Sequence, residues 1–150
     1  MSKRFQFRLE PLLKLRANAV EQAKNALATA MQNRIKKEDE LIEREEYFNQ
    51  LLLAEQDQKQ TVIGMQAIWH HRQTVQHEMR TLEREKSKLA DIESKKRDEL
   101  AEAMKQEKTV EKLKERKKTE YHESMAKEEQ TFMDEIAGRS RGGRNSNSLR

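Results

Sequence analysis

Cysteine is absent from the 150-residue chain, and turn-forming residues are scarce, with one proline and four glycines. The lack of cysteine excludes disulfide bonds and thiolate metal sites and fits a reducing compartment. No stretch approaches the roughly 18 apolar residues that a transmembrane helix requires. Charged residues interrupt the basic start of the chain. We therefore interpret it as mature sequence rather than a signal peptide, with the cytoplasm as the default location.

Charged residues make up 39% of the chain and hydrophobic residues only 34%. A compact globular core of ordinary size needs more apolar residues than this. A coiled coil needs fewer, because only two positions in seven face the partner helix. The composition therefore favours a coiled coil that binds other proteins, a form that offers no concave pocket for catalysis.

Charge is unevenly placed along the chain. The net charge is +4, and the last thirteen residues contain four arginines and no acidic residue. Without them, 27 basic residues balance 27 acidic ones. The segment 138–150 otherwise consists of Gly, Ser and Asn with one Leu, so we expect a disordered basic tail.

A first helix is predicted over residues 11–57. Pro11 suits the first helical turn, where its missing N–H is not needed. The seven-residue spacing of a coiled-coil seam follows, with one polar break at Arg34. The seam residues are Leu13, Val20, Leu27, Arg34, Leu41 and Phe48, with Ala23, Ala30 and Leu51 between them.

The seam pattern fails in the segment 55–63, and Gly64 follows. The β-branched residues 61–63 lower helix propensity, and glycine favours the left-handed conformation that ends a helix. These features predict a hairpin tip at residues 58–65.

A second helix is predicted over residues 66–137, with a weaker seam. That seam contains Ile68, Val75, Met79, Leu82, Leu89, Ile92, Leu100, Ala103 and Val110. The predicted fold is therefore all-α, with residues 1–137 forming a long antiparallel two-helix coiled-coil hairpin whose second helix is longer.

In this hairpin Pro11 is expected opposite about Lys112, and the second helix continues roughly 25 residues further. One face of the continuation is apolar, formed by Tyr121, Met125, Phe132 and Ile136. These four positions lie within about 60° of one another on a helix. Either residues 1–10 fold along this face through Phe5, Phe7 and Leu9, or it is a docking surface for another protein.

Catalytic, cofactor and metal sites are not predicted. His70, His71 and His77 lie near the tip, but a helical zinc site needs histidines at i, i+4 with further ligands nearby. No glycine-rich phosphate loop is present. Acidic residues lie among or beside the basic runs 95–97 and 112–118, which indicates a solvated mixed face rather than a nucleic-acid interface. We therefore expect a protein that is not an enzyme and has no small-molecule substrate.

The opening FQFRLEPLLKLR and the segment EKLKERKKTEYHESMAKEEQTFMDEIA resemble the two ends of the flagellar export protein FliJ family. The resemblance implies a monomeric hairpin similar to the central stalk of rotary ATPases. Such a protein acts in the cytoplasmic part of the flagellar type III export apparatus, peripherally at the membrane. It is expected to enter the ring of the export ATPase hexamer, promote ring assembly and activity, link the ring to the membrane export gate, and handle export chaperones.

The resemblance also implies two sets of docking residues. The ring-docking set is Phe5, Phe7, Leu12, Leu13, Tyr121, Met125, Phe132 and Ile136. The gate-docking set is Trp69, Thr74, Val75, Glu78, Met79 and Leu82. Thr74 stands where the family pattern leads us to expect an aromatic residue. The alternative is a generic coiled-coil scaffold, or a nucleic-acid-associated protein that uses the basic tail, and the scaffold would self-associate through its seams.

Overall fold

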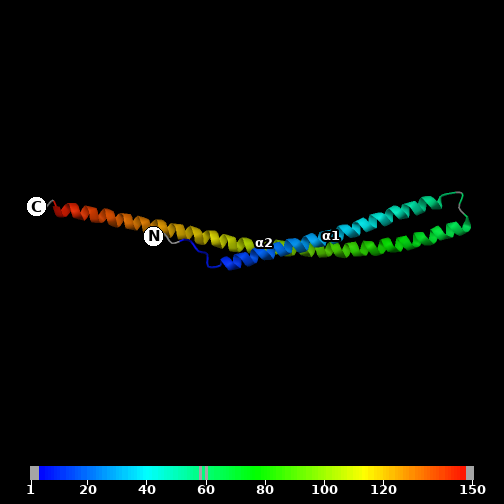
Figure 1. Cartoon of the computed structure of the whole chain (residues 1–150), viewed down its shortest axis with the longest axis horizontal. Helices are drawn as coiled ribbons and strands as arrows, with labels where there is room; N and C mark the ends of the chain where they lie inside the picture. Colours follow the sequence, from blue (N-terminus) through cyan, green and yellow to red (C-terminus); the bar gives the residue numbers. More distant parts are fainter. Residues whose placement is uncertain (1–3, 58, 60, 148–150) are drawn as a thin grey trace. The chain divides into compact units, whose positions relative to one another are not determined.

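The computed structural model describes residues 4–57, 59 and 61–147, with side chains described up to residue 142. Helix α1 (Glu10–Glu55) and helix α2 (Val62–Asn147) form an all-α antiparallel hairpin (Figure 1). The second helix is the longer, with 86 residues against 46. The predicted fold class is therefore confirmed.

The chain divides into two compact units. The hairpin unit is Asn18–Met104, and the terminal unit combines Met1–Ala17 with Lys105–Arg150. Each unit contains a part of both helices, so each has its own packing between α1 and α2.

The core of the hairpin unit is a narrow seam. Its buried apolar side chains are Val20, Ala30, Leu41 and Leu51 from α1 and Val75 from α2. Burial recurs every ten or eleven residues along α1, which is three helical turns. Two paired helices can bury only a stripe of this kind, because the rest of each helix surface faces solvent.

Val75 is the most deeply buried of these residues, at 3% exposure, and its neighbour Thr74 is exposed. Replacing Val75 by alanine is expected to lower the free energy of unfolding by about 2 kcal/mol, because buried methyl groups are lost and a cavity remains. Replacing Thr74 by alanine should change it by less than about 0.5 kcal/mol. Urea unfolding followed by circular dichroism measures both values, and equal effects of the two substitutions would contradict this packing.

One position of the second seam differs from the prediction. Ile92 is 44% exposed, whereas Glu93 is only 5% exposed. Alternating steps of four and three residues from Leu89 reach Glu93 and then Lys96 and Leu100, which is the spacing of a heptad seam. Assigning Ile92 to the seam was wrong, because helical position decides burial here and overrides the apolar character of the side chain.

The connection between the helices is shorter than predicted. Helix α1 ends at Glu55 rather than 57, and α2 begins at Val62 rather than 66. The Thr61 hydroxyl accepts a hydrogen bond from the Gly64 N–H at 3.0 Å, and the Thr61 carbonyl accepts one from the Met65 N–H at 2.9 Å. Thr61 is thus the N-cap of α2, a position that threonine favours.

Gly64 lies in the first turn of α2, and no glycine in the described part of the chain has a positive φ. The threonine cap therefore sets this boundary, and a left-handed glycine does not.

Helix α2 also continues to Asn147, ten residues beyond the predicted end at 137. Glycine and serine lower helix propensity without removing a backbone donor as proline does, and arginine is a good helix former. The backbone hydrogen bonds can therefore continue through a segment whose composition predicts disorder. Residues 148–150 of the predicted tail lie outside the described residues.

In the terminal unit, residues 4–9 form the N-terminal arm, which packs along α2 and ends in a turn at residues 8 and 9. The rings of Phe5 and Tyr121 lie 5.6 Å apart between centroids. At the start of α1, Glu10 pairs with Lys114 at 2.9 Å. This register agrees closely with the expected placement of Pro11 opposite Lys112.

Candidate protein-docking surfaces

The eight residues expected to dock in an ATPase ring all belong to the terminal unit, where they fall into two groups. The half-buried group is Phe5, Phe7, Leu12, Leu13, Tyr121 and Met125. Phe132 and Ile136 are 62% and 48% exposed, and the adjacent Met133 is 63% exposed. The apolar face of α2 is therefore half-buried as far as Met125, with Phe5 of the arm against Tyr121, and the same face is open to solvent at Phe132 and Ile136.

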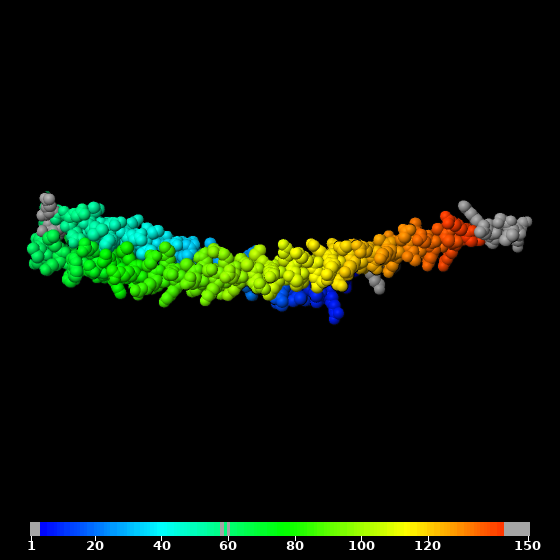
Figure 2. Space-filling model, turned by 180° about the vertical axis from the view of Figure 1, so that it is seen from behind, coloured from blue at the N-terminus to red at the C-terminus, as the bar shows by residue number. Residues whose placement is uncertain are grey.

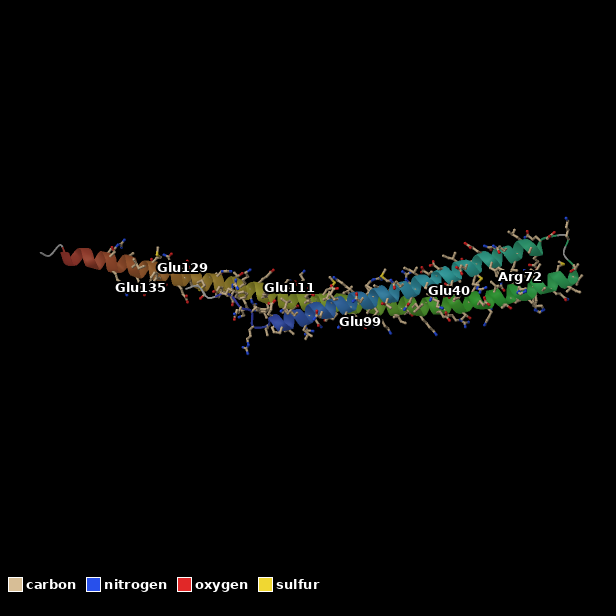
Figure 3. The ribbon with its side chains drawn as sticks, viewed as in Figure 1. Glu40, Arg72, Glu99, Glu111, Glu129 and Glu135 are labelled. Carbon is tan, nitrogen blue, oxygen red and sulfur yellow. The ribbon has the colours of Figure 1, made fainter. Side chains whose placement is uncertain are left out.

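Residues 126–142, the solitary segment, are exposed at every position. Figure 2 shows this orange-to-red part of α2 with no other segment over the face in view. Glu129 and Glu135 both lie in this segment (Figure 3), and both are exposed. Single exposed apolar residues are ordinary on protein surfaces, but Phe132, Met133 and Ile136 together form a patch of the kind that marks protein contacts.

The residues expected to contact an export gate lie in the hairpin unit, and they differ in exposure. Trp69 is 47% exposed, and its ring meets that of His70 edge-on at 5.2 Å between centroids. Glu78, Met79 and Leu82 are half-buried. Thr74 is exposed, and its hydroxyl donates to the His70 carbonyl at 3.1 Å.

Val75 is buried in the seam and is not accessible to a partner in this arrangement.

The structure adds residues of α1 to this surface. A shallow hollow of about 360 Å³ lies between the helices, and Glu40, Glu43 and Arg44 line its α1 side. Arg44 Nε lies 3.1 Å from a carboxylate oxygen of Glu78. Because such pairs join residues far apart in sequence, only the antiparallel register of the hairpin could have indicated them.

A charged cluster interrupts the seam of the hairpin unit. Arg34, the predicted polar break in α1, pairs with the buried Glu93 of α2 and with Glu38 at 2.7 Å. Arg97 Nη2 also donates to Glu93, at 3.1 Å. The hydrogen bonds to Glu93 and then Glu38 raise the pKa of the Arg34 guanidinium above its usual value. The break in the seam is therefore a matched ion pair, and sequence reasoning identified only its α1 member.

Within the described ranges, no three His, Cys, Asp or Glu side chains group as metal ligands would. Neither helix, over the residues that the structure covers, has a stretch both long and apolar enough to cross a bilayer.

The fold and its surfaces define an all-α helical hairpin with a long second helix and an exposed apolar patch near its C-terminal end. The sequence model of the flagellar FliJ protein family matches residues 5–146, so the chain belongs to this family. It is therefore a component of the flagellar export apparatus, in a family known as non-catalytic. No curated protein and no solved structure gives a significant match.

Proposed function

We propose that this chain is a stalk-like adaptor of the flagellar type III export apparatus. The terminal unit docks in the ring of the export ATPase and promotes assembly and hydrolysis of the hexamer. The hairpin unit contacts the membrane export gate, and the protein also handles export chaperones. It works as a monomeric hairpin in the cytoplasm, peripherally at the membrane of the flagellar base.

The observation that carries ring docking is the exposed apolar patch of the solitary segment. An apolar patch left open on a helix that has no partner in the described chain loses water when another protein covers it. Phe132 and Met133 are both more than 60% exposed, so most of their surface is available to a partner. Family membership supports the export ATPase as that partner.

Gate docking is supported by the half-exposed Trp69 and the interhelical hollow beside Glu78 and Leu82. Tryptophan is among the residues that contribute most to protein interfaces, because its large ring buries much area with little loss of side-chain entropy. The part of this surface that can contact a partner is Trp69, Thr74, Glu78, Met79 and Leu82. Val75 is buried in the seam under this surface.

Adding the purified protein to the cognate export ATPase tests the central proposal. Docking is expected to increase the hexamer fraction and to raise the rate of ATP hydrolysis at subsaturating ATPase concentration, because a ligand that binds only the assembled ring stabilises it. Size-exclusion chromatography with light scattering and a phosphate-release assay measure the two effects. If both stay unchanged while the added chain self-associates, the generic scaffold is the better description.

A further inference from the structure

A groove with unusual charge lies between the N-terminal arm and α2, within the terminal unit. It consists of two cavities of about 610 and 420 Å³ that share Leu9 and Leu113 in their walls. Its apolar wall residues are Phe5, Phe7, Leu9, Leu12, Val110, Leu113 and Tyr121. We call this feature the arm groove.

The charged residues that line this groove are all cations. Its lining contains Arg4, Arg8, Lys112, Arg116 and Lys117 and no acidic residue. Glu111, Glu115 and Glu120 belong to the same stretch of α2, yet none of them lines either cavity. Lys117 pairs with Glu120 at 3.5 Å, and Arg4, Arg8, Lys112 and Arg116 form no ion pair with an acidic residue of the groove lining. The lining itself therefore carries a net positive charge, which attracts anionic groups.

Tyr121 adds a second, independent observation. Its hydroxyl oxygen is buried, and no residue that the structure describes forms a hydrogen bond with it. A buried hydroxyl without a partner costs free energy, which an incoming acceptor would recover. A carboxylate is a strong acceptor for a phenolic O–H.

We propose that the arm groove binds an acidic segment of a partner protein. Bulky apolar side chains of the segment enter the groove, its carboxylates face the five cations, and one carboxylate accepts a hydrogen bond from Tyr121. The inference deepens the proposed function and rests on it for the identity of the partner, the export ATPase. The chemistry of the ligand rests on the groove alone.

The groove fits a protein segment better than it fits other anions. Base stacking on single-stranded nucleic acid needs free aromatic faces, whereas the rings of Phe5 and Tyr121 contact each other, tilted by 48° with their centroids 5.6 Å apart. A bilayer surface receives apolar side chains that protrude from a protein, whereas these line a concavity. An amphipathic acidic helix supplies both the apolar side chains and the carboxylates.

Fluorescence anisotropy with the full-length chain tests the proposal through defined probes. The probes are a labelled amphipathic peptide of Glu, Leu and Phe, its Gln-for-Glu counterpart, an oligouridine, and vesicles containing phosphatidylglycerol. The acidic peptide is expected to bind at least about tenfold more tightly than its Gln counterpart, because charge-assisted hydrogen bonds are the stronger ones. Equal binding of the two peptides overturns the proposal. The proposal is also overturned if oligouridine or the vesicles bind more tightly than the acidic peptide and this binding is lost when the groove cations are replaced.

Three variants sharpen the test. Arg116→Gln with Lys117→Gln should weaken acidic-peptide binding at least about tenfold, and the matched change of Lys88→Gln with Lys95→Gln in the hairpin unit less than about twofold. Tyr121→Phe should weaken it about threefold or more without lowering the melting temperature, because the hydroxyl has no hydrogen-bond partner among the described residues to lose. A groove that is only structural would show a fall in melting temperature and unchanged binding.

Stimulation of the export ATPase is measured in parallel with wild-type protein. Peptide binding without stimulation contradicts the proposed function and leaves the groove assignment standing. If the variant Arg116→Gln with Lys117→Gln still stimulates the ATPase and binds the peptide unchanged, the groove assignment is contradicted. The proposed function is then unaffected.

Discussion

Replacing Phe132 and Ile136 together by glutamate is expected to reduce stimulation of the export ATPase at least about tenfold, because interface residues of this kind carry most of the binding free energy. Both side chains are exposed, so the substitutions remove no internal packing and should leave the melting temperature of the free chain unchanged. A phosphate-release assay and thermal unfolding followed by circular dichroism measure the two effects.

The matched control places the same two charges on the opposite side of the helix. Gln130→Glu with Ala137→Glu adds two carboxylates about 100° to 160° away from Phe132 and Ile136 around the helix axis. Stimulation should persist in this control. If the control loses stimulation to the same degree, added charge explains the effect. If the double variant of Phe132 and Ile136 melts early yet still stimulates hydrolysis, these residues serve the fold of the chain and not docking.

Breaking the Arg34–Glu93 pair from one side is expected to produce the largest loss of stability. Arg34→Leu leaves Glu93, whose side chain is only 7% exposed, with Arg97 as its remaining partner. The side chain of Arg97 is 63% exposed and compensates only weakly. The melting temperature should fall by at least about 5 °C, because an uncompensated buried charge is costly.

The double variant Arg34→Leu with Glu93→Leu should recover the wild-type melting temperature or exceed it, because two leucines pack as an ordinary seam layer. Lys37 and Glu85 form a half-buried interhelical pair at 3.1 Å that is far more solvated than Glu93. Glu85→Gln therefore serves as the comparison and should shift the melting temperature by less than about 2 °C. A double variant that melts as low as Arg34→Leu alone would contradict the account of the buried pair.

The sequence determined the fold class because the heptad spacing depends only on positions along one helix. Val20, Leu41 and Leu51 were all placed correctly in the seam from this spacing. The pattern of the second seam is weaker because charged residues occupy some of its positions. There, Ile92 was assigned to the seam because it is apolar, although the heptad spacing places the buried Glu93 at that position.

Sites formed by segments far apart in the chain could not be predicted from the spacing of residues along one helix. The arm groove brings Arg4 and Arg8 beside residues 112–117, more than 100 positions away. In the linear sequence the latter residues lie close to Glu111, Glu115 and Glu120, none of which lines the groove. The N-cap at Thr61 was recognisable in principle, because threonine is a preferred cap residue, but the glycine three positions later gave a more conspicuous signal.

The solitary segment has a thermodynamic consequence for any complex it enters. A helix without tertiary packing is only marginally stable in water, because its backbone hydrogen bonds barely offset the entropy of ordering the chain. Residues 126–142 are exposed throughout, so contact with a partner would supply most of the stabilisation that keeps them helical. Part of the interaction free energy would then be consumed in ordering the backbone, which lowers the affinity obtained from a given contact area. Such coupling gives selective but reversible binding, which suits a component that must dissociate from its partner.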